Sequence, residues 1–196
     1  MSTAVLGGRG GLGAALAAEL GAELLDGPEG VIDDHDGLVL VVGSDPAPAV
    51  GALADLDAAG WAAQAEDVIE AAIRALQAAH ARRVGRIVVV VPTLGIAGAD
   101  GLVALTTAVE GVRALAKSAA RQWAGDGIGV NIVAVPIAAL VPELAGATRH
   151  LAPPVAPDPA ALPASVAATV RFLLGDAAAS VIGTTVVVDG GTVMAP

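Results

Sequence analysis

The clearest signal of a binding site in this sequence is the spacing of the glycines near its amino terminus. Residues 3–6 are a short apolar run, and Gly7, Gly11 and Gly13 follow it as G-x3-G-x-G. Glycines at this spacing let backbone N–H groups approach a pyrophosphate, and the helix predicted after Leu12 turns its positive end toward the same anion. Leu12 is therefore a candidate cofactor-binding residue beside the three glycines. The motif predicts a phosphate-binding turn. A tight strand-to-helix turn without a ligand is the alternative interpretation.

Two charged residues beside this loop are candidates for selecting the nucleotide. Asp26 stands where the second strand is expected to end, which is the place of an acid that binds a ribose. Arg9 lies within the loop, where a 2′-phosphate or the pyrophosphate would meet it. A solvated loop charge explains either residue equally well, so both interpretations stay open.

The rest of the chain alternates the patterns of strands and helices. Apolar runs predict strands over 3–6, 22–26, 38–42, 87–91, 130–135 and 185–188, and helical periodicity predicts helices over 13–20, 61–82, 102–125 and 164–174. Prolines interrupt residues 142–163, which we expect to be loop or short fragments. The alternation predicts a single α/β domain over 1–196, a doubly wound parallel sheet with helices on both faces.

Composition narrows the kinds of partner and site. The 196 residues include 20 acidic and 10 basic side chains, a formal charge of −10, which disfavours nucleic acid and anionic membranes as partners. No apolar run approaches the ~18 residues of a membrane span, and no basic leader precedes the first strand, so we expect a cytoplasmic protein. With no cysteine and only His35, His80 and His150 as histidines, we predict no metal site.

Several segments, in order along the chain, resemble the short-chain dehydrogenase/reductase family. The glycine loop carries the resemblance together with residues 36–39, 85–88, 127–136 and 183–191. The resemblance implies a Rossmann-like fold, an NAD or NADP cofactor and oxidoreductase activity. Because residues 21–36 hold less chain than the family has there, we expect a sheet that is shortened in the second-strand to fourth-strand region.

The catalytic positions of the family hold other residues in this chain. In the family a serine follows the central strand, a tyrosine comes thirteen residues later and a lysine four residues after that. These positions are Pro92, Leu105 and Val109, and the sequence contains no tyrosine. The family's chemistry needs a phenol acid beside an ammonium, with a hydroxyl on the carbonyl oxygen. The resemblance therefore implies that no catalytic residue is present.

Further departures fall on the nicotinamide side of the implied site. Leu40 and Val41 replace the family's paired asparagines, and Ile137 follows Pro136 where the family has glycine. The nearby hydroxyls of Thr93, Thr106 and Thr107 have no lysine or histidine at a matching spacing, and Lys117 lies too far along its helix. Binding of NAD or NADP and complete loss of the cofactor are therefore both open.

The two long helices, 61–82 and 102–125, are intact, and the resemblance implies assembly through them as a four-helix bundle. Ala108, Val112, Leu115 and Ala119 form an apolar stripe on the second of them. Our leading hypothesis is a non-catalytic subunit, in a homodimer or tetramer or in a heteromer with an active family member. The alternatives are an NAD(P)-dependent oxidoreductase with an unorthodox active site and a nucleotide-binding sensor.

Overall fold

Six parallel strands form one sheet in the order β2-β1-β3-β4-β5-β6. The computed structural model describes residues 2–8, 11–25, 35–44, 48–151, 153–155 and 158–194. The strands are β1 (Thr3–Leu6), β2 (Glu23–Leu25), β3 (Gly37–Val41), β4 (Arg86–Pro92), β5 (Gly129–Val135) and β6 (Thr185–Val187). Every neighbouring pair is parallel, as the alternation of strands and helices predicts.

The three central strands form the hydrophobic core. Valine, leucine and isoleucine make up most of β3, β4 and β5, and all their residues are buried apart from Arg86 at the start of β4. Such continuous apolar runs suit a parallel sheet that is covered on both faces. The edge strands β2 and β6 are more exposed, because each has a neighbour on one side only.

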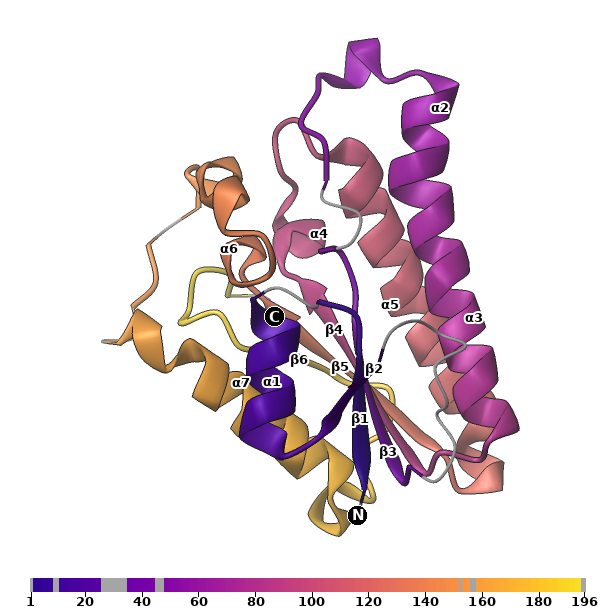
Figure 1. Ribbon diagram of the computed structural model, residues 1–196. Helices are drawn as coiled ribbons and strands as arrows, with labels where there is room; N and C mark the ends of the chain where they lie inside the picture. The colour runs from indigo at the N-terminus through magenta and orange to yellow at the C-terminus, as the bar shows by residue number, and fades with distance from the viewer. Residues whose placement is uncertain are drawn as a thin grey trace.

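Two layers of helices cover the sheet (Figure 1). On one face α1 (Leu12–Leu20) packs beside α7 (Leu162–Leu174), and on the other face α3 (Asp67–Ala81) packs beside α5 (Val103–Trp123). A short α2 (Ala58–Trp61) and a π-helical segment, Ala62–Glu66, lead directly into α3. The doubly wound architecture with helices on both faces is thus confirmed.

Short elements fill the connections between the strands and the long helices. They are α4 (Leu94–Ala97) and α6 (Ile137–Leu140), with 3-10 helices at Leu53–Asp55, Ala124–Asp126, Pro142–Thr148, Pro159–Ala161 and Asp176–Ala178. The proline-rich segment predicted as loop or short fragments therefore contains short 3-10 helices. Among the described residues, no helix is both long and apolar enough to cross a membrane.

Two predicted helices begin at least two residues earlier than expected. The Asp57 carboxylate accepts the Gly60 N–H at 2.8 Å and so caps α2 before the predicted start. Helix α7 begins at Leu162, because Pro163 in its first turn needs no hydrogen-bond partner for its nitrogen.

The apolar stripe of α5 lies mostly in the core of this chain. Ala108 and Val112 are fully buried and Ala119 is 6 % exposed, whereas Leu115 is half-buried. The exposed residues of α5 are Thr107, Ala114, Lys117, Ser118, Arg121 and Gln122. The outer face of this helix is therefore mainly polar, and the stripe by itself does not mark a partner surface.

Candidate functional site

The strand order places a crevice where parallel sheets usually bind ligands. From β1 the chain passes to β2 on one side, and β3 then joins β1 on the other. In open α/β sheets, ligands bind outside the carboxyl ends of the strands at this reversal. The glycine loop leaves β1 at that point, and Pro92 ends β4 on the same edge of the sheet.

Close packing explains three of the loop glycines. Gly7 and Gly8 have φ of 89° and 65°, which only glycine adopts without strain. A Cβ at Gly7 would lie 2.4 Å from the Val41 carbonyl oxygen, and a Cβ at Gly13 would lie 2.3 Å from that of Gly8. These glycines are therefore required for the turn to pack against β3 and against itself, whether or not a ligand binds.

Gly11 is different, because its surroundings are open. It is exposed, with φ of 83°, and the atoms nearest to a Cβ there are the carbonyl oxygens of Ala139 and Leu140, at 3.6 and 3.7 Å. Helix α1 begins at the next residue, Leu12, whose side chain is 2 % exposed and anchors the helix in the core. Gly11 and the start of α1 are thus open enough for an anion to approach, and pyrophosphate binding there stays a prediction.

Two predicted nucleotide-binding residues cannot be placed. Arg9 and Asp26 lie outside the described residues, as does the segment 26–34 between β2 and β3. Their roles beside a ribose or a 2′-phosphate stay predictions.

The three positions that correspond to the family's catalytic residues lie around the carboxyl end of β4. A Cβ at Gly43, just after β3, would lie 3.2 Å from Pro92 Cδ and 3.6 Å from Leu105 Cδ1. Val109 lies one turn after Leu105 on α5, and these two side chains are 0 and 2 % exposed. Pro92 and Leu105 therefore form an apolar contact around Gly43, and Val109 is buried one turn further along α5; no side chain of the three can donate or accept a proton.

Two of the hydroxyl groups near this contact are bound to the backbone of α5. Thr106 and Thr107 both donate their Oγ1 hydrogens to the Val103 carbonyl oxygen, at 2.8 and 2.9 Å. Ser44 has no motif to mark it in the sequence, although its Oγ is buried without a hydrogen-bond partner among the described atoms. Its only sequence signal is its place directly after Gly43. A hydroxyl without an adjacent base is a weak acid and a weak nucleophile.

Two of the histidines lie close to carboxylates, away from this contact. His35 Nε2 is 3.4 Å from Glu23 Oε2 where β2 begins, and His80 Nε2 is 3.5 Å from Asp126 Oδ2 beyond the end of α5. His80 also packs its ring 4.7 Å from that of Trp123. The described part of the chain holds no group of side chains that could bind a metal ion.

The third histidine lines an open hollow on the carboxyl side of the sheet. His150 shares this hollow of about 500 Å³ with Asp100, Glu143 and Arg149. All four residues are exposed, and the three residues at the catalytic positions are not among those that line it. The hollow therefore does not supply an acid or base to the apolar contact.

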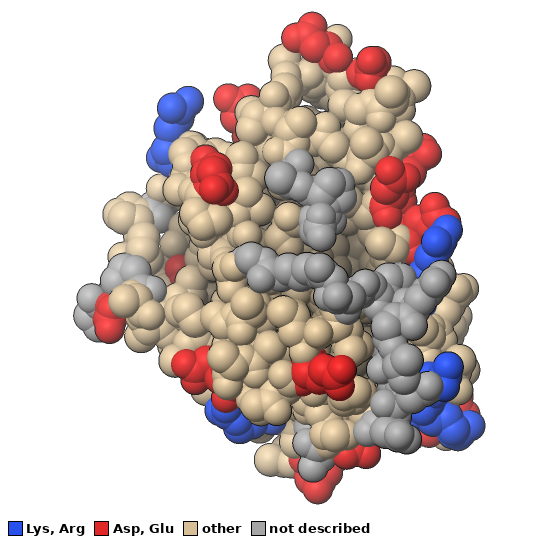
Figure 2. Space-filling view, in the orientation of Figure 1, with Lys and Arg blue, Asp and Glu red and all other residues tan. Residues whose placement is uncertain are grey.

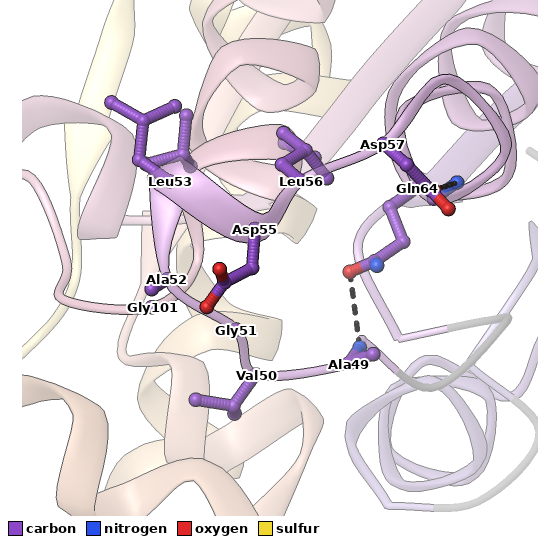
Figure 3. Close-up of a pocket in the computed structure, with 13 residues that line it drawn as sticks. Ala49, Val50, Gly51, Ala52, Leu53, Asp55, Leu56, Asp57, Gln64 and Gly101 are labelled. Carbon is purple, nitrogen blue, oxygen red and sulfur yellow. Dashed lines mark hydrogen bonds between the residues drawn. The ribbon is translucent and has the colours of Figure 1, made fainter.

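A second hollow lies beside the start of α5 (Figure 3). It measures about 200 Å³, and segment 49–57, the π-helical segment and α5 form its walls. Gln64 reaches across and accepts the Ala49 N–H at 3.1 Å, while Asp55 lies on the other side beside Gly51. Asp55 and Asp57 are the ionisable groups of its lining, so it offers carboxylates but no cationic group for the chemistry of a reductase.

Comparisons with known proteins agree with this fold. A family model described as enoyl-(acyl carrier protein) reductase matches residues 18–193. The cis-4-hydroxycyclohexanecarboxylate dehydrogenase of Sinomonas cyclohexanicum is 35% identical over 162 residues, which are 78% of this chain and 64% of that protein. The chain therefore spans just under two thirds of the length of this relative.

Solved structures show the same architecture at low sequence identity. An oxidoreductase of the short-chain dehydrogenase/reductase family from Burkholderia thailandensis has a TM-score of 0.69 at 23% identity, covering 98% of this chain and 92% of that one. The TT0495 protein from Thermus thermophilus has a TM-score of 0.72 at 22% identity, covering 97% and 98%. These structures show the shared fold, and the family match over residues 18–193 shows that the chain belongs to the short-chain dehydrogenase/reductase family of oxidoreductases, which typically use NAD or NADP.

Proposed function

We propose that this chain is a shortened, non-catalytic member of its family that acts as a structural or regulatory subunit in a homo- or hetero-oligomer with an active reductase or dehydrogenase. The observation that carries the proposal is that buried Pro92, Leu105 and Val109 occupy the positions of the family's serine, tyrosine and lysine. A positioned acid or base contributes ~10²–10⁴-fold to a rate. The three side chains that replace the catalytic group contribute nothing of this kind.

The pyrophosphate half of the site fits a dinucleotide better than the nicotinamide half does. Gly7, Gly11 and Gly13 and the start of α1 are the groups that would hold the phosphates of NAD or NADP. The cofactor would supply hydride exchange when bound. Leu40, Val41 and Leu105 offer that half of the site only apolar side chains.

The charges on the helix layer of α3 and α5 support assembly through that layer. Glu66 and Asp67 are exposed near the start of α3, whereas Lys117 and Arg121 are exposed near the end of α5. The two helices run in the same direction, because both connect parallel strands. If the two-fold axis is perpendicular to the helices, the helices of the second copy run the opposite way. The acidic start of α3 then lies at the same end of the bundle as the basic end of α5 from the other subunit.

The overall charge of −10 opposes this assembly, because it repels two copies of the chain. Acidic and basic side chains both occur along the right-hand margin of Figure 2, the side on which α3 lies in Figure 1. We therefore expect the complementary ends of α3 and α5 to matter most at low salt, since exposed charge pairs are screened within ~10 Å at 0.1 M salt.

Light scattering of charge-reversed variants tests this assembly. The double change Lys117→Glu and Arg121→Glu should halve the mass of the particle if copies of this chain meet through α3 and α5. Arg149→Glu is the matched control, because Arg149 is exposed at the end of the 3-10 helix Pro142–Thr148. Unchanged mass in the double variant would contradict assembly through this layer.

A nucleotide-binding sensor, or an oxidoreductase with an unorthodox active site, is the second candidate, and the open surroundings of Gly11 favour it. Titration with NADH and NADPH, followed by ligand fluorescence and melting temperature together, decides between these functions. Ligand at 100 times its dissociation constant adds ~2.7 kcal/mol of stability. No binding at millimolar ligand would leave the structural subunit.

If a dinucleotide does bind, turnover separates the sensor from the enzyme. The relative from Sinomonas cyclohexanicum suggests cis-4-hydroxycyclohexanecarboxylate with NAD as the first substrate pair to try. Reduction of NAD at a measurable rate would contradict the non-catalytic proposal. Binding without any reduction would favour a sensor.

A further inference from the structure

A hollow of about 760 Å³ lies at the amino ends of the strands, on the opposite edge of the sheet from the glycine loop. Thr3 begins β1, Asp36 directly precedes β3 and Arg86 begins β4, and all three line this hollow. Because the strands are parallel, these residues share one edge, which is the lower end of the molecule in Figure 1, where the chain begins. Sites for small molecules typically measure ~300–1,000 Å³. The hollow is therefore large enough for a small ligand and separate from the candidate dinucleotide site.

Two arginines line this hollow without an ion-pair partner. Arg86 is half-buried, and Arg171 is exposed in the last turn of α7. Among the described residues, no carboxylate forms an ion pair with either of them. A guanidinium stays protonated in proteins and can hold a carboxylate through two parallel N–H···O bonds. The hollow therefore contains two cationic groups that can bind an anionic group of a ligand.

Backbone contacts hold both guanidinium groups in place. Arg171 Nη2 donates to the Glu19 carbonyl oxygen at 2.8 Å, and Arg86 Nη1 donates to that of Gly85 at 3.3 Å. A Cβ at Gly129 would lie 3.0 Å from Arg86 Nη1, so the absence of a side chain there leaves room for this group. A guanidinium has several N–H donors, and one bond each leaves the others for a ligand. Because the two groups are positioned before a ligand arrives, binding costs less side-chain entropy.

Groups that attract a cation line the same hollow. Helices α1 and α7 end at this edge, and their last residues, Leu20 and Leu174, are part of the lining. The carboxyl end of a helix carries partial negative charge. Asp176 also lines the hollow, and its carboxylate forms no hydrogen bond or ion pair with another described residue, whereas that of Asp36 already accepts the Ser2 N–H at 2.9 Å. The hollow thus offers acceptors for a cationic group beside the donors of the two arginines.

We propose that this hollow binds a zwitterionic amino acid, with its carboxylate on Arg86 and Arg171 and its ammonium on Asp176. A zwitterion carries no net charge, so the chain's charge of −10 does not repel it as it repels a phosphate dianion. Leu20 and Leu174 add apolar atoms to the lining, which suit an aliphatic side chain on the ligand. The site lies at the other edge of the sheet from the catalytic positions and does not depend on the proposed non-catalytic role.

Amide NMR of the unaltered protein, with L-leucine as the probe, tests the proposal. Leucine should shift the N–H signals of Gly127 and Gly175, which line the hollow, and leave those of Gly11 and Gly13 at the opposite edge unchanged. 4-Methylpentanoate lacks the ammonium and 3-methylbutylamine lacks the carboxylate, so each should bind at least about tenfold more weakly because charge-assisted hydrogen bonds are lost.

Three results of this titration would overturn the proposal. The first is that either analogue binds as tightly as leucine. The second is that inorganic phosphate binds more tightly than leucine at matched ionic strength, which would make the hollow an anion site. The third is that leucine leaves Gly127 and Gly175 unshifted up to its solubility limit.

Two substitutions with matched controls test the residues independently. Arg171→Gln and Asp176→Asn should each weaken leucine binding about tenfold, because each removes one charged partner. Arg149→Gln and Glu143→Gln are the controls, because both residues are exposed and line the hollow on the carboxyl side of the sheet instead. Wild-type affinity in either of the first two variants, or an equal loss in the controls, would refute the assignment. Asp176 is exposed, so Asp176→Asn still decides if Arg171→Gln does not fold.

Discussion

Replacement of Gly13 by alanine isolates what the glycine loop does for the fold. The new Cβ would lie 2.3 Å from Gly8 O and 2.4 Å from Gly7 O, well inside the 3.0 Å that real Cβ contacts keep. Both atoms belong to the backbone of the turn, so no side chain can rotate away to make room. The turn must move, and the bond from Ala14 N to Gly8 O, at 3.2 Å, must lengthen or break.

The expected size of this effect follows from opposing terms. Overpacking costs ~1–3 kcal/mol, and a strained or lost backbone hydrogen bond costs ~1 kcal/mol. Alanine in place of glycine inside a helix returns ~1 kcal/mol. We expect a net loss of about 2 kcal/mol in the free energy of unfolding, which lowers the melting temperature by roughly 4–8 °C in a protein of this size.

Thermal and urea unfolding without any dinucleotide measures this loss. Gly125→Ala is the control, because nothing lies within 4 Å of a Cβ there and its backbone is not in the left-handed region. That control should change the free energy of unfolding by no more than ~0.5 kcal/mol. If Gly13→Ala melts at the same temperature as Gly125→Ala, close packing is not the reason for glycine at position 13.

Three further substitutions probe the site and the sheet edge. Gly11→Ala should abolish any dinucleotide binding seen by fluorescence, and its stability should fall by ~1–2 kcal/mol because φ is 83°. Val109→Lys should lower the free energy of unfolding in urea by ~3 kcal/mol or more, because Val109 is 0 % exposed and burial of an unpaired ammonium is costly. A variant as stable as the wild type would show that water reaches this position. Asn131→Ala should lower the free energy of unfolding in urea by ~2–3 kcal/mol, because Val181 O and Thr184 N–H lose their hydrogen-bond partner. Ser118→Ala, at an exposed site on α5, is the control.

The strands and long helices could be predicted because their signals are local. Runs such as Ile87 to Val91 have no alternative to burial, and the predicted bounds agree with β4 to within a residue at each end. Helices α4 and α6 could not be predicted, because four residues are too short to show a period of 3.6. The π-helical segment Ala62–Glu66 escapes prediction for a different reason, since its apolar pattern continues that of the flanking helices.

Motif spacing was enough to predict which residues occupy the family's catalytic positions. The burial of side chains around them could not be predicted from the sequence. Pro92 and Leu105 are far apart in the chain, yet both approach Gly43 as the family order implies. In contrast, periodicity alone cannot distinguish a helix face that packs against its own sheet from one that packs against a partner. The apolar stripe with Ala108 and Val112 has the pattern of an assembly surface, yet both residues are buried inside this chain. Ser44 belongs to no motif, so nothing in the sequence marks its buried hydroxyl.

The loop and the catalytic contact constrain function in different ways. Gly7 and Gly13 are needed by the turn itself, because a Cβ at either would collide with backbone atoms. Their presence is therefore expected in any chain with this turn, active or not, and says nothing of a cofactor. Among the described glycines of this loop, only Gly11 combines a left-handed φ with open surroundings, so another turn geometry could replace it without a clash. The case for a bound dinucleotide thus depends on Gly11, while the case against hydride transfer depends on Leu105 and Val109, and each can fail without the other.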